Sequence, residues 1–289
     1  MTLNSNYDYW VKLASRASVA TALVLIAIKL FAWFYSGSAS MLASLTDSFA
    51  DALASIVNLL AIRYAIVPAD KDHRYGHGKA EPLASLAQSI FIVASAALLI
   101  IHGFERLVHQ TPVHNAGIGI VVSAIAIVLT LALVLLQKKA LKATNSCVIE
   151  ADSLHYRSDL LLNSAVLLAL FLGQYGYLWA DGTFAILIAI FIGCQAISLG
   201  HRSVQALLDR ELDSETRQQV IDIALKDNRV KGFHDLRTRQ SGKMIFIQMH
   251  LELDKNLSLQ EAHDIADETE LRISKAFGNA EAIIHQDPV

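Results

Sequence analysis

The chain has 289 residues, of which 54% are hydrophobic and 18% are charged, and its mean hydropathy is +0.41. Soluble domains usually contain about 45–50% apolar and about 25% charged residues, so this composition favours a membrane protein. The net charge of −3 gives no sign of a nucleic-acid partner, and two cysteines, Cys147 and Cys194, argue against a disulfide framework or a cysteine zinc site.

Six segments are long and apolar enough to cross a bilayer, which takes about 20 residues of helix. They run over Leu13–Tyr35, Met41–Val67, Glu81–Val108, Ala116–Gln137, Val148–Gly173 and Leu178–Gly200. We therefore predict a mostly α membrane protein with six transmembrane helices in residues 1–208.

Basic residues indicate how these segments are oriented, because cytoplasmic loops carry an excess of lysine and arginine. The opposite side of the predicted membrane domain has little positive charge beyond Arg106. The basic residues of the second and fourth connections are Lys71, Arg74, Lys79, Lys138, Lys139 and Lys142. We expect both termini to lie in the cytoplasm.

Residues 209–289 have a soluble composition and predict a small cytoplasmic domain. Helical patterns cover 214–227 and 259–277, and strand patterns cover 230–240, 244–253 and 280–286. The order αββαβ gives a domain of about 80 residues, which is near the low end for independent stability. We expect metal binding or dimerisation to support it.

Two pairs of polar residues in apolar segments have the same spacing. Asp47 and Asp51 lie in the second segment, and His155 and Asp159 lie in the fifth. A spacing of four puts both members of a pair on one helix face, and a carboxylate costs about 2.5–3.5 kcal/mol in a bilayer on insertion scales. A divalent-metal site between the two helices is the first hypothesis. The alternative is an interhelical hydrogen-bond network with protonated aspartates.

Further polar residues extend these two stripes. Asn58 and Asn163 are each as compatible with helix packing as with support of a metal site. Asp152 and Glu150 lie near the cytoplasmic end, and we expect solvated helix ends that at most line an entrance.

The connection after the second segment contains Asp70, His73 and His77 within eight residues. These side chains can hold a metal weakly on a flexible loop, or they belong to an ordinary charged cytoplasmic loop. Their spacing does not decide between the two readings.

Histidines gather in the soluble part. His250 lies opposite the apolar face of its strand, and His285 and Asp287 share a strand face. With His234 and with His263 on the second helix, they predict a binuclear zinc site in which Asp287 bridges two ions. Scattered surface histidines are the alternative.

These features together resemble the cation diffusion facilitators, and the bacterial zinc and ferrous-iron efflux branch most of all. The resemblance rests on the two spaced pairs, on the αββαβ domain and on residues 73–81, His-Arg-Tyr-Gly-His-Gly-Lys-Ala-Glu. It covers essentially the whole chain.

The resemblance implies a homodimer in the bacterial inner membrane that exports Zn²⁺, with Fe²⁺ or Cd²⁺ as other substrates. It implies a transport site of Asp47, Asp51, His155 and Asp159, a weaker loop site and regulation by metal at the cytoplasmic site. It also implies an inter-subunit charge interlock of Lys79 and Asp209 and a hydrophobic gate at Leu154.

A mechanism follows from the chemistry of His155. Imidazole ordinarily titrates near pH 6.5 and binds metal only when neutral, so H⁺ competes with the metal. We expect proton–metal antiport by alternating access and no enzymatic activity. An intramembrane metalloenzyme is disfavoured, because four protein ligands leave no position for a catalytic water. A metal-gated channel, a sensor or a metal-binding scaffold without transport are the other rivals.

Overall fold

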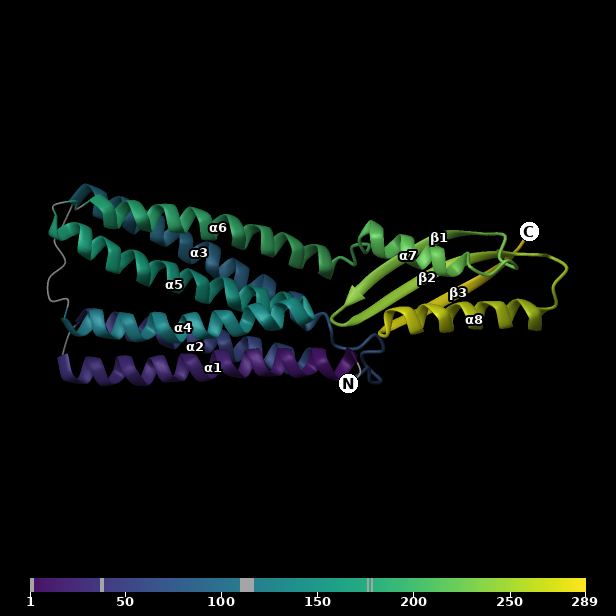
Figure 1. Cartoon of the computed structure of the whole chain (residues 1–289), viewed down its shortest axis with the longest axis horizontal. Helices are drawn as coiled ribbons and strands as arrows, with labels where there is room; N and C mark the ends of the chain where they lie inside the picture. Colours follow the sequence, from purple (N-terminus) through teal and green to yellow (C-terminus); the bar gives the residue numbers. More distant parts are fainter. Residues whose placement is uncertain (1–2, 37–38, 110–116, 176, 178) are drawn as a thin grey trace. The chain divides into compact units, whose positions relative to one another are not determined.

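The computed structural model describes residues 3–36, 39–109, 117–175, 177 and 179–289. Its first part consists of long helices that run side by side (Figure 1). Their bounds are α1 (Leu3–Ser36), α2 (Ala39–Ala65), α3 (Ala80–His109), α4 (Gly117–Thr144), α5 (Cys147–Gln174) and α6 (Trp179–Leu207). Ala116 and Leu178, at which two of the predicted segments begin, lie outside the described residues.

Within the described residues, five helices are long and apolar enough to cross a membrane, namely α1, α2, α3, α4 and α6. The remaining long helix, α5, is not apolar enough over a sufficient length to count as such a candidate span. Its first half carries Asp152, His155, Arg157 and Asp159, and these polar residues interrupt the apolar run.

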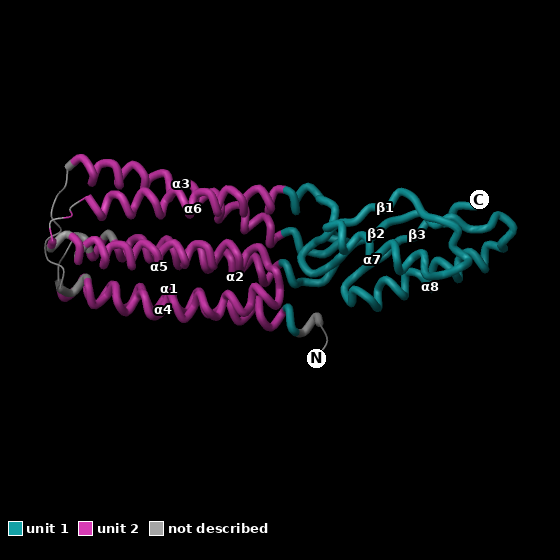
Figure 2. Tube along the Cα trace, turned by 45° about the horizontal axis from the view of Figure 1, so that its top comes forward, with its two compact units in different colours: residues 1–7, 65–79, 205–289 teal, residues 8–64, 80–204 magenta. Residues whose placement is uncertain are grey.

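The chain forms two compact units (Figure 2). The larger unit comprises residues 8–64 and 80–204, and the smaller comprises residues 1–7, 65–79 and 205–289. The smaller unit therefore includes the connection 65–79, which the sequence had placed with the membrane part. The reason is a close contact: a Cβ atom on Gly78 would lie 2.4 Å from the carbonyl carbon of Ser241.

In the larger unit, small residues allow two helices to approach closely. A Cβ atom on Gly182 of α6 would lie 2.6 Å from the carbonyl oxygen of Gly103 on α3. The same two helices are joined by a hydrogen bond between Ser203 and Ser85 and by the ion pair of Arg106 with Asp181. Close packing of small residues is the usual way in which membrane helices associate.

The smaller unit contains a three-stranded sheet with the order β1-β2-β3. Its elements are α7 (Ser214–Ala224), β1 (Gly232–Ser241), β2 (Met244–Leu253), α8 (Leu259–Phe277) and β3 (Ala280–Pro288). β1 and β2 form an antiparallel hairpin, and β3 pairs parallel to β2 after the α8 crossover. The helix α7 ends at Ala224, three residues earlier than the sequence pattern predicts, and Leu225 is its cap residue.

One face of this sheet packs against the helices. Ile247, Met249 and Leu251 of β2 form a buried cluster with Val220 of α7 and Ile265 of α8. Residues of β2 alternate between the two faces, so His250 lies on the face that these helices do not cover. The fold thus leaves one face of the sheet free to carry polar side chains.

Candidate metal sites

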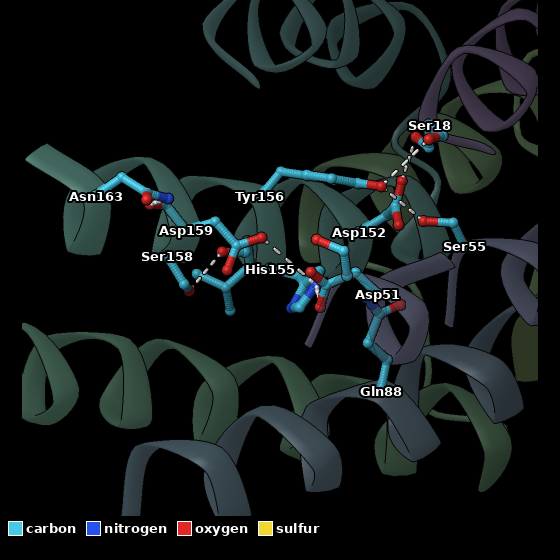
Figure 3. A network of polar contacts seen from close by, with 12 residues as sticks. Ser18, Asp51, Ser55, Gln88, Asp152, His155, Tyr156, Ser158, Asp159 and Asn163 are labelled. Carbon is cyan, nitrogen blue, oxygen red and sulfur yellow. Dashed lines mark hydrogen bonds and ion pairs between the residues drawn. The ribbon is translucent and has the colours of Figure 1, made fainter. Parts of the chain in front are cut away.

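Three ligand groups meet between α2 and α5 (Figure 3). His155 Nε2 lies 2.9 Å from Asp51 Oδ1 and 3.7 Å from Asp159 Oδ2. His155 is buried, and the two carboxylates are half-buried. One imidazole and two carboxylates from neighbouring helices are a donor set that suits zinc and other first-row divalent ions.

The cluster opens into a cavity of about 470 Å³. Asp47 lines this cavity together with Asp51, His155 and Asp159, and the apolar side chains of Phe91 and others from α3 and α6 complete the wall. The carboxylate of Asp47 is not among the ligand atoms that lie within 4.8 Å of one another. The structure therefore brings three of the four predicted transport-site ligands together and places the fourth in the same cavity.

Leu154 precedes the site histidine and packs against an apolar cluster of α3 and α6, formed by Ile92, Ile192 and Ala196. A second cavity of about 290 Å³ is lined by Leu154, Glu150 and other residues near the start of α5. Leu154 is among the residues that line this second cavity and is not among those that line the ligand cavity. Its role as a gate stays a prediction.

The two asparagines of the polar stripes have different partners. Asn163 donates to the carbonyl oxygen of Asp159 at 2.7 Å, one turn earlier in its own helix. Asn58 donates to Asp152 at 3.1 Å and to Gln88 of α3. In the hydrogen bonds of the described residues, neither amide bonds to a carboxylate of the ligand cluster. Asn58 joins α2 to α3 and α5, whereas the contact of Asn163 stays within α5.

Asp152 is not the solvated helix end that we expected from the sequence. Its side chain is buried at 4% exposure and accepts hydrogen bonds from Ser18 of α1 at 2.5 Å and Gln137 of α4 at 2.8 Å, besides the bond from Asn58 of α2. One carboxylate on α5 thus joins three other helices. Figure 3 shows Asp152 beside Ser18. Position near a helix end did not reveal this, because burial there depends on the neighbouring helices.

Tyr156 adds to the same network. Its hydroxyl donates to the carbonyl oxygen of Ser18 at 3.2 Å and lies 2.9 Å from the hydroxyl of Ser55 on α2. We did not single out Ser18, Gln137 or Tyr156 from the sequence. Isolated polar residues inside apolar segments were the available signal.

The loop cluster lies in the smaller unit. His77 Nε2 lies 3.3 Å and His73 Nδ1 lies 3.5 Å from the carboxylate oxygens of Asp70. The backbone amide of His73 donates to Asp70, and this hydrogen bond is the largest cause of a pKa of Asp70 below its usual value. His77 is buried, while the other two are exposed. These three residues form a compact set of ligands that is open to solvent on one side.

Lys79 and Asp209 form an ion pair within the chain, at 2.9 Å. The sequence resemblance implied a contact between subunits. Lys79 also donates to the carbonyl oxygen of Leu207, and Arg239 lies 3.5 Å from the other carboxylate oxygen of Asp209. Burial opposes ionisation of Asp209, but the hydrogen bond and charge of Lys79 outweigh it and lower the pKa of Asp209.

Three histidines form a row across the sheet, because His234 pairs with His250 and His250 pairs with His285. Asp287 lies beside this row, 3.0 Å from His234, 2.8 Å from His250 and 3.3 Å from His285. The hydrogen bond with His250 is the largest cause of a lowered pKa of Asp287. One carboxylate thus contacts three imidazoles, which suits a bridging ligand.

His263 does not join this row. It lies on α8, which packs on the other face of the sheet, and its ring contacts Asp267 at 3.4 Å. The helical pattern alone did not tell us which face of the sheet the helix covers.

Comparison with known proteins places the chain in a family. A family model for the cation efflux transmembrane domain matches residues 15–208, and one for the cation efflux protein cytoplasmic domain matches residues 212–289. The chain is 73% identical over 289 residues to the cation-efflux pump FieF of Shewanella oneidensis, covering all of this chain and 98% of that protein. It is 49% identical over 286 residues to FieF of Klebsiella pneumoniae, covering 99% and 95% of the two chains.

Among solved structures, the metal-bound C-terminal domain of the CzcD transporter from Thermotoga maritima aligns with a TM-score of 0.25 and 23% identity. The alignment covers 26% of this chain and 87% of that domain. The family assignment rests on the sequence matches, which span both units. The chain belongs to the cation diffusion facilitator family and is of the FieF type.

Proposed function

We propose that this protein exports divalent metal cations from the cytoplasm in exchange for protons. The observation that carries the proposal is the meeting of Asp51, His155 and Asp159 inside an apolar helix bundle. Ionisable residues at membrane depth are costly and usually mark an ion pathway. The names of the FieF relatives, which are cation-efflux pumps, support the direction of transport.

The transport site consists of Asp47, Asp51, His155 and Asp159. Asp47 supplies the fourth ligand from the wall of the shared cavity once a metal ion enters. Zn²⁺ is the expected substrate, and Fe²⁺ or Cd²⁺ fit the same donor set less selectively. In one of the alternating states, the apolar side chain of Leu154 closes the passage between the ligand cavity and the second cavity.

Protons drive the exchange through His155. A neutral imidazole binds metal, whereas a protonated one repels it, and the ordinary pKa of imidazole lies between the pH of an acidic exterior and that of the cytoplasm. Protons that enter from outside displace the metal, and the cytoplasm removes them again. His155 contacts both Asp51 and Asp159, so its protonation state acts on two ligands at once.

We further propose that α5 crosses the membrane with the other five long helices. Two of the polar residues that lower its hydropathy, Asp152 and His155, are buried in the bundle, which supports this proposal, whereas Arg157 is exposed. Both termini then lie in the cytoplasm of a bacterial cell, and the protein sits in the inner membrane as a homodimer.

The smaller unit senses metal. His234, His250, His285 and Asp287 form the regulatory zinc site, and Asp70, His73 and His77 form a weaker one. His263 is left out of the regulatory site of a single chain, because it lies on the other side of the sheet. Metal binding at the sheet favours association of two copies and biases the transport cycle.

Reconstituted vesicles test the proposal. Purified full-length protein in vesicles with an imposed pH gradient should move zinc, and Asp51→Ala should abolish this flux while leaving the protein folded. Ser153→Ala is a suitable control and should transport normally, since the buried hydroxyl of Ser153 has no hydrogen-bond partner among the described residues. Full zinc flux in Asp51→Ala would overturn the site assignment.

A further inference from the structure

Lys29 is a positively charged residue inside an apolar stretch of α1, between Ile28 and Leu30. Its side chain is half-buried. A lysine at such a position is costly unless it has partners, and in membrane proteins it usually has a functional reason. Neither the family match nor the sequence pattern assigned it a role.

The ammonium group of Lys29 bonds to α2. It donates to the hydroxyl of Ser48 at 2.7 Å and to the carbonyl oxygen of Ser44 at 3.1 Å. Ser44 and Ser48 are four residues apart, Asp47 and Asp51 are four residues apart, and each serine lies three residues before one of the aspartates, so all four share one helix face. The ammonium therefore lies on the face of α2 that carries two of the proposed metal ligands.

Among the described residues, the hydrogen-bond partners of Lys29 are neutral groups, so no carboxylate neutralises its charge in a direct pair. Its charge is nevertheless close enough to act electrostatically on the carboxylates of Asp47 on α2 and Asp159 on α5, which both line the ligand cavity. A charge placed beside a site and not within it remains when the metal leaves.

We propose that Lys29 is the fixed counter-charge of the transport site, an inference that rests on the proposed function. Asp47, Asp51 and Asp159 bring three negative charges, a divalent ion supplies two positive ones and Lys29 supplies the third. The loaded cluster of these groups is then neutral, which favours its passage through a low-dielectric bundle. Repulsion between Lys29 and the metal also keeps binding weak enough for release.

The test is zinc binding by the full-length protein, with the loop and cytoplasmic clusters disabled by Asp70→Ala and Asp287→Ala. In this background Lys29→Met should bind Zn²⁺ about tenfold more tightly in titration calorimetry, because repulsion of a divalent ion by a nearby unit charge is removed. Lys29→Arg keeps the charge and should bind like the parent. In vesicles, Lys29→Met should release zinc more slowly than the parent protein does.

Two controls separate charge from structure. Lys12→Met removes a charge from the cytoplasmic end of the same helix and should leave zinc affinity unchanged. Ser48→Ala removes a hydrogen bond of Lys29 but keeps its charge, so it should lower stability without tightening binding. Lys29→Gln provides a second neutral variant if the methionine variant does not fold.

The outcomes distinguish this inference from the function on which it rests. Unchanged or weaker zinc affinity in the neutral variants, with normal binding by the parent, would overturn the role of Lys29 alone. If Ser48→Ala tightened zinc binding as much as Lys29→Met does, the effect would come from the lost hydrogen bond and not from the charge. This result would likewise overturn the role of Lys29. Absence of zinc binding by the parent would instead overturn the proposed function.

Discussion

Replacement of Asp152 by alanine should destabilise the helix bundle strongly, because three buried donors lose one shared acceptor. Ser18, Asn58 and Gln137 all donate to this carboxylate from other helices. Hydrogen bonds between membrane helices are worth about 0.6 kcal/mol on average and up to about 1.7 kcal/mol. Three of them predict a loss of about 2–5 kcal/mol in the free energy of unfolding.

Two further variants make this prediction specific. Asp152→Asn keeps one acceptor, and the buried Oε1 of Gln137, which has no hydrogen-bond partner within the described part of the chain, can accept from the new amide. We expect it to lose about half as much stability as Asp152→Ala. Ser153→Ala, at the next position, removes a buried hydroxyl that bonds to none of the residues that the structure describes, and it should change stability by less than about 0.5 kcal/mol.

The assay is equilibrium unfolding of the full-length protein in mixed micelles, titrated with a denaturing detergent and followed by circular dichroism. The order of stability should be parent, Ser153→Ala, Asp152→Asn and Asp152→Ala. A loss in Asp152→Ala no larger than that in Ser153→Ala would refute the reasoning, because it would mean that the network is not a net source of stability.

Three other predictions concern separate parts of the chain. Gly78→Ala would place a Cβ atom 2.4 Å from Ser241, so it should displace the loop and weaken zinc binding at the loop cluster, measured by titration calorimetry, without changing the membrane site. His155→Asp should shift metal preference from zinc toward cadmium or manganese in flux assays with a metal panel; an unchanged order would count against His155 as a ligand. Hydrogen bonds from Arg229 lower the pKa of Asp227, so the stability that Asp227 adds should be complete above about pH 4 and lost as the pH falls through its lower folded pKa. Chemical unfolding of Asp227→Asn and parent at several pH values checks this; a gap in stability that widens in acid would contradict it.

The sequence predicted elements well where periodicity alone defines them. The strand Met244–Leu253 and the helix Leu259–Phe277 have the bounds that their patterns indicated. Alternation along β2 also placed His250 opposite the apolar face, because side chains of a strand point to opposite sides in turn. The four-residue spacing of Asp47 with Asp51 and of His155 with Asp159 placed each pair on one helix face, and three of these side chains, those of Asp51, His155 and Asp159, lie close together.

The sequence failed where the answer depends on neighbours far along the chain. Asp152 is buried by neighbours that are distant in sequence. Ser18 is 134 residues away along the chain, yet its hydroxyl oxygen lies 2.5 Å from the carboxylate of Asp152. His263 is separated from the histidine row because α8 covers the other face of the sheet, which a helical pattern does not specify. Lys29 was overlooked because a single lysine in an apolar segment has no spacing to read, although its cost in a membrane was a signal.

Reversal of the pH gradient tests the central account most directly. In vesicles with the same zinc concentration on both sides, the account predicts net zinc movement away from the less acidic side, with internal pH changing at the same time. Reversing the gradient should reverse both signals, and Asp51→Ala should abolish them together. Zinc that equilibrates regardless of the gradient, or moves without a matching proton flux, would show a channel and contradict proton–metal antiport.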